Sequence, residues 1–201
     1  MQGNKWFLAL LTSVAAVSLT SPAMAACMSA PDGWYFEANV GSSHLSNDNF
    51  PGDSSSSGVG FNGNFGYKFM PYGAIEAGVA RYPETEISDL VTGDLAATVK
   101  HYSYDLAAKA ILPISDSGFE GFAKLGVVRL VSKTTINNND VASSMNIGIS
   151  SNSSTGIYLG IGGQYYISPE FAVVAQWQRA HGNVDTGSED LFSIGVSILF
   201  V

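Results

Sequence analysis

The last eleven residues, 191–201, alternate between apolar side chains and mostly small or polar ones. The apolar positions are Phe192, Ile194, Val196, Ile198 and Phe200, and the positions between them are Ser193, Gly195, Ser197 and Leu199. Alternation with a period of two predicts a β-strand that has one apolar face. A soluble sandwich turns such a face toward its core, whereas a membrane barrel turns it toward lipid. An aromatic residue near the chain end favours the membrane barrel.

The same alternation recurs along the chain and predicts eight strands. They cover about residues 33–45, 58–69, 74–82, 98–112, 119–130, 155–167, 171–179 and 191–201. Long polar loops at about 46–57, 83–97, 131–154 and 180–190 alternate with three short turns. Outer-membrane barrels have an even number of strands, short periplasmic turns and long outer loops. The pattern therefore predicts an all-β fold, an eight-stranded antiparallel transmembrane β-barrel of up-and-down topology.

The composition of the second face separates this fold from a soluble, lipocalin-like barrel. A soluble barrel points its apolar face inward and needs a richly charged exterior. Here the second face holds mainly Gly, Ala, Ser and Asn, and only 13% of all residues are charged. This suits a narrow lumen. Aromatic residues near the strand ends predict two interfacial girdles, formed by Trp34, Phe69, Tyr72, Phe119, Tyr166, Phe171 and Phe200 on the turn side and by Tyr82, Trp177 and Phe192 on the loop side.

The first 25 residues have the pattern of a secretory signal peptide. Lys5 precedes an apolar stretch at 6–17, and Ala23-Met24-Ala25 forms a small-residue cleavage motif. We expect a signal peptide at 1–25 and a barrel domain at 26–201. Cys27 leaves a lipid anchor open as an alternative, because small residues precede it as in a bacterial lipobox. As the only cysteine, it allows no disulfide within the chain.

Composition argues against several classes of function. Lysine and arginine are few and scattered, and the net charge is −8, so no nucleic-acid partner is expected. No zinc-ligand spacing is present, and we expect neither a metal nor a cofactor. The three histidines, His44, His101 and His181, lie far apart, and no serine stands two residues from His181. The sequence therefore predicts no catalytic residues and no enzymatic activity.

Short segments of the chain resemble the OmpA-like eight-stranded outer-membrane barrel family, which includes opacity-type surface antigens. They are Gly33-Trp34-Tyr35-Phe36, 74–78 (AIEAG), 104–107 (YDLA), 123–127 (AKLGV) and 193–197 (SIGVS). The resemblance covers nearly all of the mature chain and implies the outer membrane of a Gram-negative cell. It also implies that the terminal strand carries the signal read by the barrel-assembly machinery, with Ile194, Val196, Ile198 and Phe200 as its apolar marks. The family usually ends on the aromatic residue, whereas Val201 follows it here. No stretch of this sequence resembles the family's periplasmic peptidoglycan-binding domain, so we do not expect that part of the family's role.

Six charged residues fall on the predicted inner face. They are Glu37, Lys68, Glu76, Asp105, Lys109 and Lys124. Enclosed charges are costly unless they are paired. One hypothesis is therefore an ion-pair network that closes the narrow lumen. The alternative is that some of them lie at the rim in water.

The long loops carry most of the remaining acidic residues, including Glu84, Glu86, Asp89, Glu189 and Asp190. Such loops fit contacts with divalent cations, lipopolysaccharide or a host molecule, or they are simply solvated. The leading hypothesis is a structural and surface-interaction protein, with adhesion as one form of this role. A narrow pore for small solutes and a lipid-modifying enzyme are the alternatives.

Overall fold

The computed structural model describes residues 31–46, 56–88, 95–114, 117–138, 149–183 and 186–200. These form the strands β1 (Gly33–Ser46), β2 (Ser56–Met70), β3 (Gly73–Arg81), β4 (Thr85–Ser88), β5 (Leu95–Ile114), β6 (Phe119–Ile136), β7 (Ser151–Ser168), β8 (Phe171–His181) and β9 (Ser188–Phe200). The described part of the chain contains no helix long and apolar enough to cross a membrane. The predicted signal peptide, Cys27 and Val201 lie outside the described residues.

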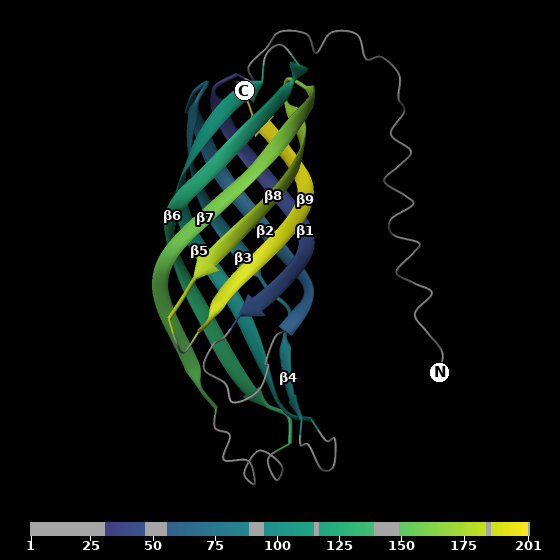
Figure 1. Ribbon diagram of the computed structural model, residues 1–201, viewed down its shortest axis with the longest axis vertical. Helices are drawn as coiled ribbons and strands as arrows, with labels where there is room; N and C mark the ends of the chain where they lie inside the picture. Colours follow the sequence, from purple (N-terminus) through teal and green to yellow (C-terminus); the bar gives the residue numbers. More distant parts are fainter. Residues whose placement is uncertain are drawn as a thin grey trace, which may run out of the picture.

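The strands form one closed antiparallel barrel (Figure 1). Each strand except β3 pairs with the next in the chain, and β9 returns to pair with β1 from Trp34↔Phe200 to Ser46↔Ser188. β3 and β4 both pair with β5, so they are two parts of a single barrel strand that is interrupted at residues 82–84. The barrel therefore has eight strands in up-and-down order, and the predicted fold is confirmed.

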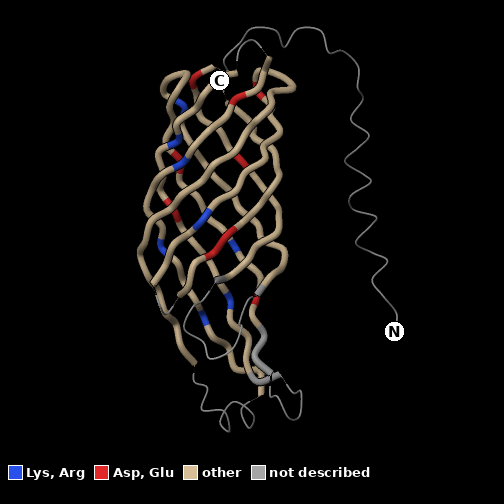
Figure 2. Tube along the Cα trace, viewed as in Figure 1, with Lys and Arg blue, Asp and Glu red and all other residues tan. Residues whose placement is uncertain are grey.

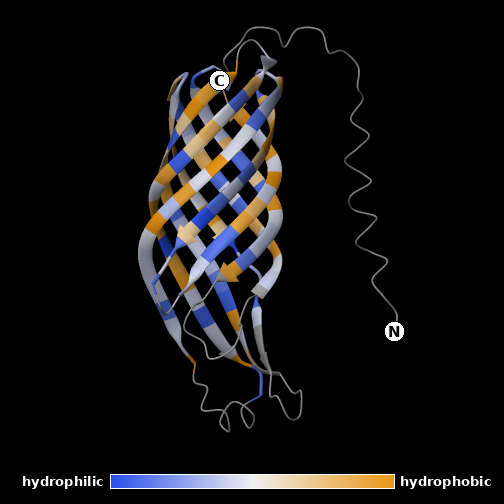
Figure 3. Cartoon of the chain, viewed as in Figure 1, coloured by the Kyte–Doolittle hydropathy of each residue, from blue (hydrophilic) through white to orange (hydrophobic). Residues whose placement is uncertain are grey.

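Side chains alternate between the inside and the outside of the barrel as predicted. In β9, Phe192, Ile194 and Phe200 are exposed, whereas Leu191 and Ser193 are buried. Most of the large exposed side chains of the other strands are likewise apolar, and the buried ones include many polar residues. Figure 3 shows this as hydrophobic and hydrophilic residues that alternate along the ribbons. The outer surface is therefore the lipid-facing one.

The strands extend farther toward the loops than the sequence predicted. β5 has 20 residues and β6 and β7 have 18 each, although about 9–11 residues suffice to cross a bilayer. The predicted loop at 83–97 is wrong in part, because 85–88 form β4 and 95–97 belong to β5. The loop predicted at 131–154 is also shorter, since 131–136 and 151–154 are strand. Residues 131–136 (VSKTTI) are mostly β-branched and favour extended backbone.

Candidate functional site

The buried side chains inside the barrel form three stacked layers. The turn-side layer is apolar and consists of Tyr35, Ala74, Ile111, Phe122, Val174 and Leu199. The loop-side layer is also apolar and consists of Ala80, Tyr82, Ala107, Val128, Leu130, Tyr158, Ala180 and Leu191. Between them lies the central layer, in which the buried polar residues are Glu37, Asn39, Asn62, Asn64, Glu76, Lys109, Lys124 and Gln176. The charges of the central layer are thus covered on both sides by apolar side chains.

Two lysines and two glutamates form the centre of the polar layer. Lys124 Nζ lies 2.7 Å from Glu76 Oε2 and 3.5 Å from Glu37 Oε1. Lys109 Nζ lies 3.1 Å from Glu76 Oε1 and 3.5 Å from Glu37 Oε2. Each charge therefore faces two opposite charges, and all four side chains are almost completely buried. Mutual neutralisation of this kind offsets the cost of removing the four groups from water.

Neutral side chains complete this layer. Asn39, Asn64 and Gln176 each donate a side-chain amide hydrogen bond to Glu37 Oε1, at 2.8–3.1 Å. The Tyr35 hydroxyl donates to Glu76 Oε1 at 2.6 Å. These four donors come from three strands of the barrel, β1, β2 and β8. The carboxylates are consequently held by hydrogen bonds as well as by ion pairs, which fixes their orientation.

The other two predicted lumen charges lie apart from this group of four. Lys68 Nζ pairs with Glu120 Oε1 at 3.3 Å, and Gln164 Nε2 donates to Glu120 Oε2 at 2.6 Å. Asp105 is buried, but its Oδ2 has no hydrogen-bond partner, and no ion pair in the described part of the chain includes it. Thus the structure brings Glu37, Glu76, Lys109 and Lys124 together. Lys68 joins them only through Glu120 and Gln164, whose Oε1 accepts a hydrogen bond from Lys109 at 3.3 Å, and Asp105 has no ion pair among the described residues.

Sequence reasoning missed Glu120 as a lumen residue. It stands on the same face of β6 as Lys124, four positions earlier, so its parity alone was a sufficient signal. Glu189 was assigned to a loop, and this is wrong. Because β9 begins at Ser188, Glu189 is part of a strand and its side chain is 1% exposed.

The loop-side mouth of the lumen holds a polar group around Glu189. Its carboxylate accepts a hydrogen bond from Ser43 Oγ at 3.4 Å and lies 3.7 Å from His101 Nδ1. His101 Nε2 in turn lies 3.4 Å from the Thr85 hydroxyl. The His101–Glu189 distance exceeds that of a hydrogen bond, so this arrangement is looser than the base–orienter contact of a nucleophilic site.

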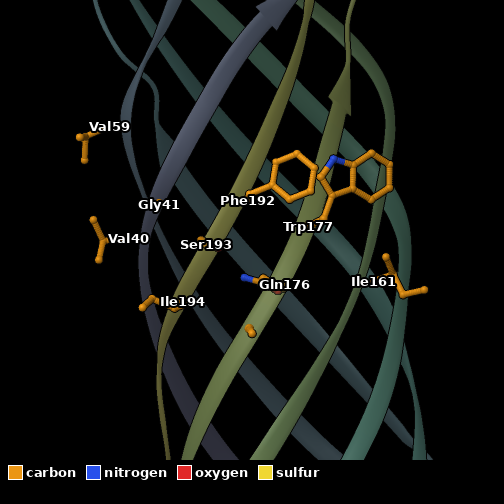
Figure 4. A pocket seen from close by; sticks show the side chains of 10 residues that line it. Val40, Gly41, Val59, Ile161, Gln176, Trp177, Phe192, Ser193 and Ile194 are labelled. Carbon is orange, nitrogen blue, oxygen red and sulfur yellow. The ribbon is translucent and has the colours of Figure 1, made fainter.

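The outer wall of the barrel carries an aromatic pair above a shallow apolar hollow. The rings of Trp177 and Phe192 lie side by side, 6.3 Å apart (Figure 4). Trp177 Nε1 donates to Asp190 Oδ1 at 3.2 Å, as an interfacial indole does when its apolar part faces lipid. The hollow has a volume of about 620 Å³, and its lining includes the outward-pointing side chains of Val40, Ile161 and Ile194.

The assignment of two residues to the predicted aromatic girdles is wrong. Tyr82 is 2% exposed and belongs to the loop-side layer, and Tyr166 packs against the turn-side layer. Their hydroxyl groups find partners inside the lumen: Tyr82 with Ser103 at 3.1 Å and Tyr166 with Gln164 at 2.9 Å. The sequence-based assignment used closeness to strand ends and ignored parity, which places both side chains on the inner face.

Comparison with known proteins supports the same fold. No curated protein sequence matches the chain. Among solved structures, it is similar to Neisserial surface protein A (17% identity, TM-score 0.61, 84% of this chain and 97% of that chain). It is also similar to the N-terminal β-barrel domain of Pseudomonas aeruginosa OprF (15% identity, TM-score 0.56, 85% of this chain and 100% of that chain). A third similar structure is that of Ail, the attachment invasion locus protein of Yersinia pestis, solved in complex with the heparin analogue sucrose octasulfate (18% identity, TM-score 0.53, 84% of this chain and 99% of that chain).

A family model assigns the chain on sequence grounds as well. The model for the outer membrane protein beta-barrel domain matches residues 9–200, which include every strand of the structure. The match agrees with the lipid-facing apolar exterior and with the alternation of short turns and long loops. The chain therefore belongs to the outer membrane protein beta-barrel domain family, and its place is the outer membrane.

Proposed function

We propose that this protein is a structural and surface-interaction protein of the outer membrane that makes its contacts at the loop-side end of the barrel. The observation that carries this proposal is the length of β5, β6 and β7. Each exceeds the membrane-crossing length by about seven to eleven residues. Together with β4, they form a raised sheet beyond the lipid-facing band, which presents a surface to molecules outside the cell.

The chemistry of the raised sheet suits polar contacts. Its outward positions carry Lys133, Thr135 and Ser153, and Arg129 donates a hydrogen bond to the Ser153 hydroxyl at 3.1 Å. Ser150 and Thr134 are linked across the sheet by their hydroxyls at 3.2 Å. Relatives in fold support an interaction role, since one is named an attachment invasion locus protein and another a surface protein.

We further propose that the lumen is closed and that the central layer acts as a plug. Its charges neutralise one another, and apolar layers cover it on both sides. An eight-stranded barrel has an interior only wide enough for side chains to fill it. These features favour a structural role over a pore for small solutes. Partners of the proposed role are lipid, lipopolysaccharide and a molecule on a neighbouring surface.

Replacement of the loop tips tests the interaction role. Residues 89–94 and 139–148 are each exchanged for a short Gly/Ser turn, and binding of whole cells to host cells and to an abiotic surface is measured. We expect the variant to assemble in the outer membrane and to bind no better than cells lacking the protein. Exchange of residues 115–116 in a short turn is the matched control and should leave binding unchanged. Wild-type binding by the loop-tip variant would refute the interaction role.

A further inference from the structure

All five cations that point outward from the described barrel wall lie on its loop-side half. They are Arg81, Lys100, Arg129, Lys133 and Arg179. The three other lysines of the strands, Lys68, Lys109 and Lys124, point into the lumen. Figure 2 shows Lys and Arg both near the end that holds the C-terminus and farther toward the opposite end. The outer surface of the turn-side half therefore has no described cation, whereas the loop-side half has five.

The three arginines stand where the apolar band ends. Arg81 is the ninth residue of β3, Arg179 the ninth of β8 and Arg129 the eleventh of β6, counted from the turn-side end of each strand. A transmembrane strand crosses the hydrocarbon region in about 9–11 residues. The guanidinium groups consequently lie at the outer membrane–water interface, where the phosphate groups of outer-leaflet lipid are found.

Aromatic residues stand beside these cations on the outer wall. Arg129 pairs across the sheet with Tyr104, and Arg81 pairs with Tyr102 on one side and Phe61 on the other. Tyrosine and other aromatic side chains concentrate at the level of the lipid headgroups. This independent marker gives the same depth as the strand count.

The carboxylates that contact this group leave part of it uncompensated. Glu84 forms ion pairs with both Arg81, at 2.7 Å, and Lys100, at 3.7 Å. Among the described residues, the Arg129 guanidinium has only its hydrogen bond to the Ser153 hydroxyl, and the Lys133 side chain has neither an ion pair nor a hydrogen bond. Lys100 and Lys133 also stand directly opposite each other on β5 and β6. Like charges in this position repel, and a bound anion would remove the repulsion.

An apolar hollow adjoins these cations. It has a volume of about 360 Å³ on the outer face of β2, β3 and β5, and its lining includes Phe61, Val79 and Tyr104. Arg81 and Tyr102 line its loop-side rim. A hollow with an apolar floor and a cationic rim is complementary to a lipid with acyl chains and a phosphorylated head.

We propose that the outer face of β3, β5 and β6 is a binding site for the lipid A part of lipopolysaccharide. Arg129, Lys133 and Lys100 bind its phosphate groups, and the hollow beside Arg81 receives an acyl chain. This inference rests on the proposed contact with lipopolysaccharide. The site lies on the wall and not in the loop tips, so the loop-tip experiment and the lipid A experiment can fail separately. A sulfated polysaccharide fits less well, because these cations point sideways among interfacial aromatic residues.

The test compares lipid A binding by the full chain and by an R129Q/K133Q variant in detergent micelles, measured by native mass spectrometry. Neither substitution leaves a carboxylate unpaired, so both variants should keep the heat-modifiable gel mobility of a folded barrel. We expect roughly 10- to 30-fold weaker binding, since each cation near an anionic lipid surface contributes about a factor of five. The charge-conserving variant R129K/K133R should bind as the wild type does. Lipid A without phosphates should bind the wild type as weakly as intact lipid A binds the neutral variant.

Three results would overturn the proposal. The first is equal lipid A affinity of the folded neutral variant and the wild type. The second is displacement of lipid A by millimolar inorganic phosphate, which would indicate a site for the free anion. The third is tighter binding of a heparin fragment than of lipid A through the same two side chains.

Discussion

At the residue scale, the central layer depends on Lys124 more than on any other side chain. Its ammonium group contacts both buried glutamates, and it comes from β6, opposite the β1 strand that carries Glu37. A buried ion-pair group of this type has little net stability of its own. Its members depend on one another, because each charge left without a partner retains its full cost of burial.

We therefore expect Lys124→Met to lower the free energy of unfolding by about 3–5 kcal/mol, since it leaves two buried carboxylates with one lysine. Urea unfolding of the refolded barrel in lipid vesicles, followed by tryptophan fluorescence, measures the change. Lys133→Met removes the same charge from the exposed outer face of the same strand and should change the value by no more than about 0.5 kcal/mol. Equal effects of the two substitutions would contradict the proposed role of the central layer.

At position 126 only glycine fits, because the backbone of β5 approaches this residue closely. A Cβ atom at this position would overlap the carbonyl oxygen of Leu106 on β5, which is backbone and has no room to move. We expect Gly126→Ala to lower the free energy of unfolding by about 1–3 kcal/mol in the same urea titration. Gly121→Ala is the control on β6, because its Cβ would lie 3.9 Å from the nearest atom. A stable Gly126→Ala barrel would show that β5 and β6 separate easily.

Residue-level prediction from sequence succeeded where parity decided the outcome. The alternation of β9 placed Phe192 outside and Ser193 inside, as the structure has them. Partner choice was beyond the sequence, because Lys68 and Lys124 have the same parity and the register of neighbouring strands decides which carboxylate each one meets. Glu120 forms an ion pair with Lys68, whereas Glu37 and Glu76 form ion pairs with the other two lysines.

At the element scale, the two terminal strands close the barrel. β9 pairs with β1 over the whole of its length, and its last described residue, Phe200, stands opposite Trp34 with its side chain exposed on the outer wall. The existence of all eight barrel strands was predictable from the period of two. The extra lengths of β6 and β7 were not, because Ser- and Thr-rich segments are compatible with either a strand or a polar loop until a neighbour pairs with them.

We propose that the end of β9, from Ile194 to Phe200, is the signal for barrel assembly. Phe200→Ser should then reduce the amount of folded protein in the outer membrane several-fold, measured as heat-modifiable barrel in membrane fractions. Phe192→Ser removes an equally exposed aromatic side chain from the same strand, away from its end, and should assemble nearly as the wild type does. If both variants assemble to the same extent, the terminal position has no special role.

At the scale of the whole molecule, the barrel works as a closed cylinder with different chemistry on each of its surfaces. The lumen is filled in three layers, the outer wall is apolar up to its arginines, and the raised sheet is polar. Since the layers lie one behind another, we expect the passage of ions to be blocked at three separate levels. Removal of one layer alone leaves the other two in place.

Planar-bilayer recording tests this arrangement. We expect no steady conductance from the purified wild type, nor from Phe122→Ala or Tyr158→Ala, which truncate the turn-side and the loop-side layer respectively. A triple variant that adds Lys109→Ala removes a large side chain from every layer and should conduct, provided that its gel mobility shows a folded barrel. Ile161→Ala, on the outer face, is the control for loss of volume. A large steady conductance of the wild type would refute the closed lumen, because ions can cross a filled barrel only if its layers open together.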